Sequence, residues 1–535
     1  MLGRFEGVPL VPDVDVIIAG VGPVGAALAG LLAQRGLQVA AFDRLADLYP
    51  LPRAIGLDHE AMRIFQELGI AERVLPFTAQ YRPSEYRGVD GAPIKRLDMA
   101  PPPHRLGWAP NHVFDQPALE RALRQRLAEL PGVTVRYATE VASFFDEGTH
   151  VCVDIQAEDG RRERLRAKYL VACDGGSSPI RKALGIGLDD LGFDEAWLVV
   201  DAIINDDKLA DLPQTQVQYC EPERPCTFVV GPGNHRRWEI MLQPGDSLSS
   251  DAFPEDQLWR LLSRWIRPGD GTLRRAAAYR FHGLIAKQWR KGRVLLAGDA
   301  AHMTPPFMAQ GMVQGLRDAQ NLAWKLERVI RGESPQALLE TYGTERQPHV
   351  ETTTRGAIAL GRVICERDPA QARARDAAMR AEQGDEIRTT IRQTMVPDLR
   401  HGLIAAGTPG AGQLCPQPLV RAAEGTQALL DDLTGARVRT IAIAPLADDE
   451  IDALTRATER LGGRVALLGA DRTSCRQAMQ ELQPVMAPWL TELQRTIAIV
   501  RPDHYVYGTA ATVDDALALL DDLATRLAEP TVNRV

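Results

Sequence analysis

The chain lacks three features that would restrict its location or its partners: a CxxC cysteine pair, an excess of basic residues and a long apolar run. Its seven cysteines are odd in number and scattered, which favours reduced thiols over a disulfide framework and predicts a cytoplasmic protein. The net charge of −8 argues against nucleic acid or an anionic membrane as a partner, because both bind a basic face. No apolar run approaches the ~20 residues of a membrane helix, and no secretory signal is evident at the N-terminus.

The length and composition are those of a globular protein with several domains. A chain of 535 residues exceeds what one hydrophobic core supports, so roughly two to four domains are expected. The composition, 45% hydrophobic and 25% charged, is ordinary for such a protein.

The N-terminal region predicts a strand, a glycine-rich turn, a helix and a second strand. The run Val14–Ala19 is short, rich in β-branched residues and apolar apart from Asp15, which is typical of a strand buried on both faces. The turn that follows fits GxGxxG at Gly20, Gly22 and Gly25, and Asp43 ends the next strand. Such a turn brings a helix N-terminus close to a pyrophosphate, and the acid accepts hydrogen bonds from a ribose. The alternative is a plain structural turn between strand and helix.

Two further motifs place an acid and glycines at a strand end. "DGGSSPIR" runs from Asp174 to Arg181, and Gly298-Asp299 follows the apolar run "RVLLA". Each acid alone could be an ordinary helix cap, because Asp is a favoured cap residue. After Asp299 a Pro-rich turn leads to a long helix that starts near Gly311, so the positive end of that helix points towards a ligand.

The remainder of the chain changes character twice. Residues 190–280 alternate polar and apolar side chains, which predicts a mostly antiparallel sheet. Residues 326–400 are charge-rich and predict helix. A Gly/Pro-rich stretch, residues 405–418, predicts a linker, and short apolar runs beyond it predict a small α/β domain.

In this order and spacing, the three motifs resemble the fingerprint of class A FAD-dependent aromatic monooxygenases, the p-hydroxybenzoate hydroxylase-like flavoproteins. The segments "LPRAIGLDHEAMRIFQELG", "EPERP", "RRWEIMLQPG" and "RVLLAGDAAHMTPP" look like the 3-(3-hydroxyphenyl)propionate hydroxylase branch. The C-terminal "RPDHYVYG" resembles the thioredoxin-like domain of phenol hydroxylase relatives. Because CxxC is absent there, no thiol–disulfide chemistry is expected.

The resemblance implies an α/β fold: a Rossmann-like FAD-binding domain with an inserted antiparallel-sheet substrate domain, followed by a thioredoxin-like domain. The implied boundaries are residues 1–75, 100–185 and 281–345 for the FAD-binding domain and residues 76–99 and 186–280 for the substrate domain. Residues 346–404 form a helical segment, 405–418 a linker and 419–535 the thioredoxin-like domain.

The resemblance also assigns residues to the cofactor. Gly20, Gly22, Gly25 and Asp43 would hold the ADP half of FAD, and Asp299 would bind the ribityl chain. Arg181 shares with Asp174 a motif linked in the family to both FAD and NAD(P)H. The full set expected to bind the cofactor is Gly20, Gly22, Gly25, Asp43, Arg53, Gln116, Asp174, Asp299, Pro305, Gln310, Gly311 and Met312.

The implied reaction is hydroxylation of a small phenol by NAD(P)H and O₂ through a flavin C4a-hydroperoxide. The cofactor performs the oxygen transfer, while the protein orients the ring, excludes water and helps to deprotonate the phenol. His302 and Tyr219 are candidate catalytic groups, although a structural hydrogen bond accounts for His302 equally simply. Tyr219 and Trp238 lie on strands of the sheet that is expected to cover the substrate ring, so both could contact the substrate. The alternative is that they only pack within the sheet, since aromatic residues favour strands. No metal site is expected.

One position departs from the family pattern. The family usually has a small residue shortly after the Pro-Pro pair, where this chain has Met308 and Ala309. Met308 could narrow the substrate pocket or restrict movement of the flavin, or it could simply fill a packing gap.

Two other functions remain open: hydroxylation of a larger polycyclic phenol in biosynthesis, and FAD binding without redox activity, which only Met308 beside the flavin would support. A flavin halogenase is disfavoured, because a WxWxIP-type segment is absent. The sequence does not distinguish NADH from NADPH, and a homodimer is compatible with it.

Overall fold

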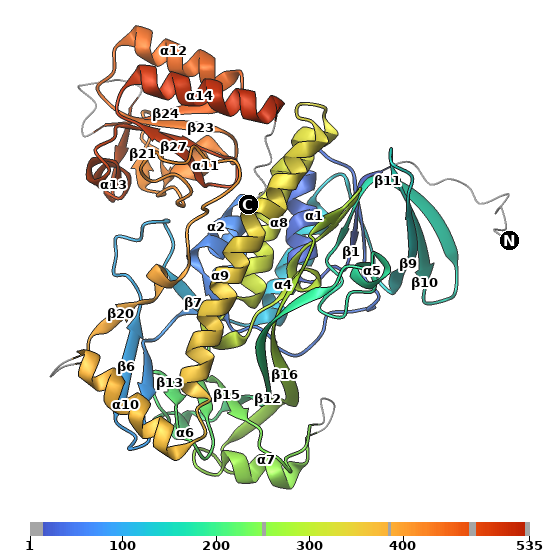
Figure 1. Cartoon of the computed structure of the whole chain (residues 1–535), viewed down its shortest axis with the longest axis vertical. Helices are drawn as coiled ribbons and strands as arrows, with labels where there is room; N and C mark the ends of the chain where they lie inside the picture. The colour runs from blue at the N-terminus through green and yellow to red at the C-terminus, as the bar shows by residue number, and fades with distance from the viewer. Residues whose placement is uncertain (1–13, 249–252, 384–386, 470–477, 530–535) are drawn as a thin grey trace.

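Four β-sheets organise the part of the chain that the computed structural model describes, residues 14–248, 253–383, 387–469 and 478–529. Figure 1 shows the three larger sheets along the long axis of the molecule, with the C-terminal sheet at one end and β12 and β16 at the other. The helices α1 and α8 lie between these two ends. Within the described residues, no helix combines the length and apolar character needed to cross a membrane.

The N-terminal strand–turn–helix–strand unit forms as predicted. The strand β1 (Val14–Ala19) leads into α1 (Pro23–Gln34) and then β2 (Val39–Phe42). β1 pairs in parallel with β2 on one side and with β11 (Arg162–Ala172) on the other. This central position buries Val16, Ile17 and Ile18 completely and explains why the strand is apolar from Val16 to Ala19, whereas Asp15 lies at its partly exposed start.

The eight-stranded sheet runs in the order β17-β18-β11-β1-β2-β8, with β10 and β9 attached beside β11. Its other strands are β8 (Val133–Arg136), β9 (Thr139–Asp146), β10 (Val151–Ala157), β17 (Arg290–Lys291) and β18 (Val294–Leu296). The small sheet β3-β7-β4 lies beside it, with strands Gly56–Asp58, Asn111–Phe114 and Thr78–Gln80.

The helix α8 (Gly311–Ile330) is buried along most of its length, from Val313 to Leu326. It packs against α1, α2 (His59–Glu67) and α9 (Glu340–Ile364). The close approach to α1 requires glycine, because a Cβ at Gly315 would lie 2.4 Å from a methyl carbon of Val24. The other helices of this part of the molecule are α3 (Ala71–Val74), α4 (Gln116–Glu129) and α5 (Pro179–Ala183).

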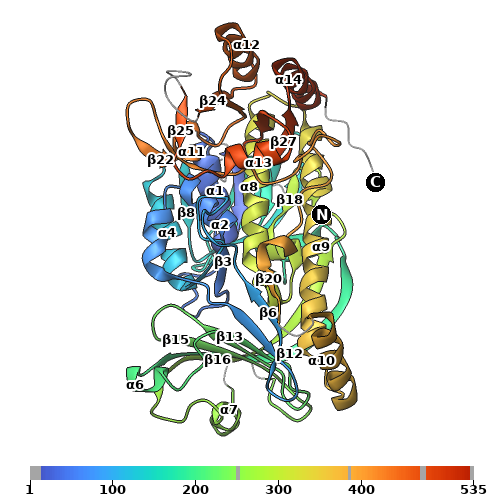
Figure 2. The ribbon, with the colours of Figure 1, turned by 90° about the vertical axis from the view of Figure 1, so that its left-hand side faces the viewer.

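The nine-stranded sheet is mostly antiparallel and runs in the order β19-β16-β12-β15-β14-β13-β5-β6-β20. One face packs under α7 (Glu255–Leu262) in a core of its own that contains Trp238 and Phe228. Figure 2 shows this sheet at the end of the molecule opposite the C-terminal domain. Its strands are β5 (Ser84–Arg87), β6 (Pro93–Asp98), β12 (Leu188–Ile204), β13 (Gln216–Tyr219), β14 (Cys226–Val230), β15 (His235–Met241), β16 (Gly271–Ala286), β19 (His302–Met303) and β20 (Thr389–Ile391).

The expectation of a purely helical segment over residues 346–404 is wrong at its end. Helices α9 and α10 (Pro369–Gln383) are present, but the chain then forms the strand β20. β20 pairs in parallel with β6 and extends the nine-stranded sheet at its edge. A partner more than 290 residues away in sequence supplies these hydrogen bonds, so local propensity could not reveal the strand.

The C-terminal sheet has the order β22-β21-β25-β24-β23-β26-β27. α12 (Asp448–Glu459) and α14 (Val513–Ala528) share one hydrophobic cluster with it, and a second cluster contains residues of α11 (Leu430–Thr434) and α13 (Met486–Glu492). The strands are β21 (Leu419–Arg421), β22 (Gln427–Leu429), β23 (Arg439–Ile443), β24 (Arg464–Gly469), β25 (Met479–Glu481), β26 (Ile497–Val500) and β27 (Val506–Ala510).

The stretch 405–418 contains no helix or regular strand, but it is not a free linker. Backbone N–H groups of Ala405, Gly412 and Cys415 donate to carbonyls of the C-terminal domain, and Gln417 donates to the Arg105 carbonyl at 2.8 Å. The stretch therefore connects the C-terminal domain to the rest of the molecule through many backbone contacts.

Candidate functional site

A cavity of about 670 Å³ lies between the eight-stranded sheet and the nine-stranded sheet. It receives residues from the carboxyl ends of β1, β2 and β11 and from one face of β12 to β16. Of the residues expected to bind the cofactor, ten line it: Gly20, Gly22, Gly25, Asp43, Arg53, Gln116, Asp174, Asp299, Gly311 and Met312. Pro305 and Gln310 do not line it.

The glycine-rich turn after β1 has the shape of a phosphate cradle. Gly20 has φ +95°, and a Cβ there would lie 2.3 Å from the carbonyl oxygen of Cys173. A Cβ at Gly25 would lie 2.0 Å from the carbonyl oxygen of Gly20. At Gly22 a Cβ would meet nothing within 4 Å, so this side of the turn is open. Gly22 caps α1 without a side-chain acceptor, which leaves N–H groups of the first turn for an anion.

Asp43 lies directly after β2 and braces this turn. Its Oδ2 accepts a hydrogen bond from the Val21 N–H at 2.7 Å, and its Oδ1 accepts one from the Leu45 N–H at 2.9 Å. Each carboxylate oxygen keeps a lone pair for a hydroxyl group in the cavity.

Gln116 positions the loop that carries Arg53. Its Oε1 accepts hydrogen bonds from the N–H groups of Arg53 and Ala54, at 3.0 and 2.6 Å, and its Nε2 donates to Glu120. The Arg53 side chain is exposed beside the cavity. Gln116 therefore fixes the backbone from which the Arg53 guanidinium group extends beside the cavity.

Most of the Asp174–Arg181 motif lines the cavity, but its arginine lies behind the cavity wall. Asp174 lines the cavity, its Oδ1 is buried without a partner among the described residues, and burial raises its pKa. Arg181 does not line the cavity. Its guanidinium group donates to the carbonyls of Ala300 and Gly176, at 2.9 and 2.8 Å, and so ties this motif to the Gly298-Asp299 turn.

The Asp299 carboxylate opens onto the cavity while protein surrounds it, and this burial raises its pKa. It accepts no hydrogen bond from the residues that the structure describes. Asp318 of α8 holds the turn in place: its Oδ2 accepts from the Gly298 N–H at 3.0 Å and lies 2.7 Å from Nε2 of His302. Asp299 thus presents unpaired oxygen atoms to a ligand.

His302 is a structural residue. It is fully buried, binds Asp318, and its ring stacks on Trp289 at a centroid distance of 5.3 Å. The structure does not place His302 at the cavity, where a catalytic role would require it, and its contacts are those of a structural residue.

The N-terminus of α8 reaches the cavity through Gly311 and Met312. Gln310 lies one residue before the helix, and its Oε1 accepts a hydrogen bond from Nη1 of Arg317 at 2.7 Å. The resemblance places Pro305 and the backbone of Gln310–Met312 at the flavin ring; of these residues Gly311 and Met312 line the cavity, and Pro305 and Gln310 do not. The helix end remains available to stabilise negative charge.

Tyr219 and Trp238 lie on the wrong face of the nine-stranded sheet for a substrate role. Both pack in the core under α7, where Trp265 Nε1 donates to the Tyr219 hydroxyl at 3.3 Å. Along a strand, successive side chains point to opposite faces, so their neighbours Gln218 and Arg237 face the cavity instead. The structure therefore places neither Tyr219 nor Trp238 at the cavity, where the expected substrate contacts and the catalytic role of Tyr219 would require them.

Met308 also does not line the cavity. It is 2% exposed, and its sulfur lies 3.4 Å from the position of a Cβ on Gly356 of α9. These contacts are those of a side chain that fills a packing gap, and the structure does not place Met308 where it would touch a substrate. The small residue at the cavity is Ala309, which has φ +54°.

Sequence reasoning missed the polar residues of the sheet that face the cavity. Arg237 spans the two halves of the site: its Nε donates to Asp201 at 2.8 Å, and its Nη1 donates to the Arg53 carbonyl at 2.8 Å. The sequence did contain one signal for this face: in β15 the charged residues Arg237 and Glu239 alternate with the apolar residues Trp238 and Ile240, which indicates that one face of the strand is polar. The missed set includes Gln216, Gln218, Thr227, Arg237, Glu239, Arg275, Tyr279 and Phe281.

Arg392, directly after β20, is a second missed contribution. It is buried in the cavity wall, donates from Nη2 to the Met308 carbonyl at 2.6 Å and from Nη1 to the Tyr81 hydroxyl at 3.1 Å. Nothing in the local sequence marks it, because the pairing of β20 with β6 brings it to the site.

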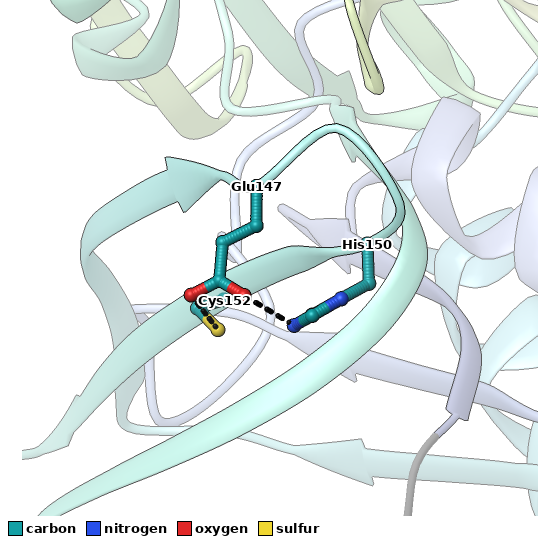
Figure 3. A group of neighbouring side chains, drawn as sticks. All are labelled: Glu147, His150 and Cys152. Carbon is teal, nitrogen blue, oxygen red and sulfur yellow. Dashed lines mark hydrogen bonds and ion pairs between the residues drawn. The ribbon is translucent and has the colours of Figure 1, made fainter.

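Three residues of types that can bind a metal ion lie close together outside the cavity, on the hairpin of β9 and β10 (Figure 3). Glu147, His150 and Cys152 point toward one another there. Nε2 of His150 lies 2.8 Å from Glu147 Oε2, and the Cys152 thiol donates to Glu147 Oε1 at 3.5 Å. Because these groups bind one another on an exposed turn, we assign them no chemistry.

A glycine cradle at a helix N-terminus, two ribose-type acids and a second sheet closing over them define a dinucleotide-binding oxidoreductase. The family model described as FAD binding domain matches residues 13–357, and the model described as HcaD C-terminal domain matches residues 412–526. The chain belongs to the class A FAD-dependent aromatic monooxygenases, which confirms the resemblance drawn from its motifs.

Two relatives match along almost the whole chain. The "Probable NADH-specific resorcinol 4-hydroxylase" of Rhodococcus jostii (strain RHA1) is 39% identical over 524 residues, covering 96% of this chain and 95% of the relative. The "3-(3-hydroxy-phenyl)propionate/3-hydroxycinnamic acid hydroxylase" of Burkholderia cenocepacia (strain HI2424) is 33% identical over 524 residues, covering 94% of each.

Solved structures support the fold. The flavin-dependent monooxygenase PieE, in complex with FAD and substrate, has a TM-score of 0.79 at 21% identity and covers 98% of this chain and 100% of its own. Aklavinone-11 hydroxylase has a TM-score of 0.77 at 23% identity, covering 96% and 99%. The expected α/β flavoprotein monooxygenase fold is confirmed.

The residues present fit FAD. The open side of Gly22 and the uncapped start of α1 suit the pyrophosphate, and Asp43 suits a ribose. The unpaired carboxylate of Asp299 suits the hydroxyls of the ribityl chain, and Gly311 would face the flavin ring. The chain is thus an FAD-dependent aromatic monooxygenase whose cofactor cradle is preformed.

Proposed function

We propose that the protein hydroxylates a small phenol, with NADH as the electron donor and O₂ as the oxidant. The observation that carries this proposal is the 39% identity, along nearly the full length of both chains, to the relative named as an NADH-specific resorcinol hydroxylase. The polar face of the nine-stranded sheet supports it, because a small phenol needs hydrogen-bonding groups that orient its ring.

The residues of the chain would orient the ring and exclude water. When bound, the flavin supplies the activation of O₂ and the transfer of one oxygen atom to the ring. Tyr279 and Phe281 of β16 offer aromatic faces to the substrate, and Gln218 offers an amide. Arg237 binds the carbonyls of Pro52 and Arg53, and so keeps the sheet closed over the cofactor loop.

A panel of phenols tests the proposal. Resorcinol, 3-hydroxyphenylpropionate, 4-hydroxybenzoate and an anthracyclinone-type polycyclic phenol would each be assayed for product together with NADH and NADPH consumption. We expect stoichiometric hydroxylation of a one-ring phenol with NADH preferred. Coupled turnover of the polycyclic phenol alone would support the biosynthetic alternative, which here rests only on fold similarity to structures below 25% identity.

The redox-silent alternative loses its one support. It depended on Met308 blocking the flavin, and Met308 packs against α9 instead. Colourless protein that cannot be reconstituted with FAD, or FAD-loaded protein that no phenol stimulates, would revive it.

We further infer that the C-terminal domain is thioredoxin-like and has no thiol chemistry. A central sheet with α12 and α14 in one hydrophobic cluster and α11 and α13 in the other supports this architecture. Ala444-Pro445 follows β23, where a thioredoxin would present its cysteines. The domain would then serve as a structural support for α8.

A further inference from the structure

Glu239 is a buried carboxylate that faces the cavity without a hydrogen-bonding partner. It lies in the middle of the nine-stranded sheet, opposite Val199 of β12 and Thr227 of β14, and all three residues line the cavity. Glu239 is 7% exposed, and within the described chain its carboxylate accepts no hydrogen bond. Its ion pair with Arg237 is long, at 3.7 Å. A buried acid in this state needs a partner from the ligand.

The other acids of the cavity wall are accounted for. Asp43 accepts two backbone hydrogen bonds, Asp174 accepts the Ile180 N–H, and Asp299 belongs to the turn that faces the ribityl chain. Glu140 lies on β9, on the side of the cavity near Asp43. Among the described residues that line the cavity, Glu239 is thus the carboxylate on the sheet that would cover the substrate ring.

We propose that Glu239 is the general base that removes the proton of the phenolic hydroxyl. This inference rests on the proposed function and names the residue for a step that the reaction requires. The phenol O–H bond breaks, its electron pair stays on the phenolate oxygen, and a new O–H bond forms on the Glu239 carboxylate. The phenolate ring is more electron-rich and so accepts oxygen more readily. The proton leaves for water when the product departs.

The surrounding charges suit this exchange. Arg237 on the same strand and Arg275 on β16 are cationic, while Asp201 on β12 binds Arg237 and offsets part of its charge. Cys226 on β14 stays neutral, because burial raises the pKa of its thiol well above the usual value. Proton transfer moves one negative charge from Glu239 to the phenolate and leaves the net charge of the cavity unchanged. The arginines stabilise either anion.

The pH dependence follows from the state of Glu239. Burial raises the pKa of this carboxyl, and the charge of Arg237 opposes the rise only in part. The base is active when ionised, so kcat/KM should fall as the pH decreases through this raised pKa. A carboxyl with a pKa nearer to neutrality is also a stronger base.

The test compares Glu239→Gln and Glu239→Asp with the control Glu195→Gln. Glu195 is a half-buried acid of β12, in the same sheet but outside the cavity wall. All variants would be loaded with FAD and assayed with the phenol that the wild type hydroxylates. We expect Glu239→Gln to lose about 10²-fold or more in kcat, with little change in KM, and to lose the acidic limb of the pH profile. Glu239→Asp should retain that limb at a reduced rate, and Glu195→Gln should behave as wild type.

A series of ring-fluorinated phenols separates a base from a structural residue. If Glu239 removes the proton, the loss in Glu239→Gln should shrink as the phenol becomes more acidic and as the pH rises, since preformed phenolate then binds directly. An equal loss for every phenol at every pH, or wild-type kcat in Glu239→Gln, would overturn the inference. Normal FAD content and unfolding midpoint in the variant exclude misfolding. A wild type that hydroxylates no phenol would instead refute the proposed function.

Discussion

The hydroxyl of Tyr505, in the C-terminal domain, donates a hydrogen bond of 2.9 Å to Oε1 of Glu60 on α2. The other oxygen of Glu60 binds Arg317 of α8, whose Nη1 donates to Gln310 just before the helix begins. A buried chain of contacts therefore runs from the C-terminal domain to the end of α8 that reaches the cavity. Burial, with the adjacent charge of Glu60, raises the pKa of Tyr505 well above its usual value, so it remains a donor.

The variant Tyr505→Phe should weaken FAD binding and lower stability. It removes a buried hydrogen bond to a charged group, which is worth about 1.5–3 kcal/mol. Isothermal titration with FAD and denaturant unfolding would measure both effects. The control is Tyr507→Phe, two residues along the chain, whose hydroxyl binds Asp522 within the C-terminal domain. It should change stability alone, and equal FAD affinities in both variants would contradict the role given to Tyr505.

Asp43→Ala should raise the dissociation constant for FAD. The substitution removes the expected hydrogen bond to the ribose, and it removes the acceptor of the Val21 and Leu45 N–H groups. Loss of one charge-assisted hydrogen bond should weaken binding by about 1.5–3 kcal/mol. Quenching of FAD fluorescence gives the affinity. Asp47→Ala is the matched control, because its side chain is 92% exposed and lies outside the cavity. If both variants bind FAD equally, Asp43 does not hold the cofactor.

Asp201→Asn should destabilise the protein by about 3–5 kcal/mol at neutral pH, because it leaves Arg237 buried without its carboxylate. Although burial raises the pKa of Asp201, the charge of Arg237 and the hydrogen bonds from His235 and Arg237 outweigh it and lower the pKa to about 2. A group with a lowered pKa contributes stability above its unfolded value of 3.8 and loses it as the pH falls through about 2. Urea unfolding from pH 7 to pH 2 should therefore show the two proteins converging at the acidic end. A constant difference over this range would argue against the ion pair.

Met308→Ala should lower the free energy of unfolding by about 2–5 kcal/mol without changing the fraction of NADH lost as peroxide. The side chain fills the space beside α9 and does not face the cavity. Ala309→Gly, at the adjacent residue that does line the cavity, is the contrasting variant and should change that fraction. Peroxide assays together with thermal unfolding distinguish the two positions. A change in peroxide yield for Met308→Ala would place Met308 beside the flavin after all.

Cys415→Ser should leave hydroxylation intact. Cys415 is fully buried, its thiol donates to the Pro416 carbonyl, and burial raises its pKa to about 11, so it is not a thiolate at neutral pH. Steady-state turnover and native thiol labelling provide the measurement. A loss of turnover in folded, FAD-loaded protein would show that the C-terminal domain takes part in the chemistry. Cys475→Ser should likewise leave hydroxylation intact; Cys475 lies outside the described residues.

The sequence by itself determined the cofactor half of the site. Gly20, Asp43 and Asp299 act at the ends of strands, where a short local pattern prescribes both the backbone conformation and the ligand it can approach. Parallel strands bring these ends to the same edge of the sheet, so three separate motifs necessarily converge there. The helix start at Gly311 could also be predicted from the local sequence, because the first N–H groups of any helix are unpaired and can bind an anion.

Only the tertiary structure decided the substrate half. In an antiparallel strand, a shift of one residue exchanges the two faces, so the composition of β13 and β15 could not show that Gln218 and Glu239, and not Tyr219 and Trp238, face the cavity. The pairing of β20 with β6 brings Arg392 into the wall across about 290 residues of sequence. Contacts of this kind are formed between distant segments whose local sequences do not specify each other, and for that reason the groups nearest the substrate became visible only in the folded chain.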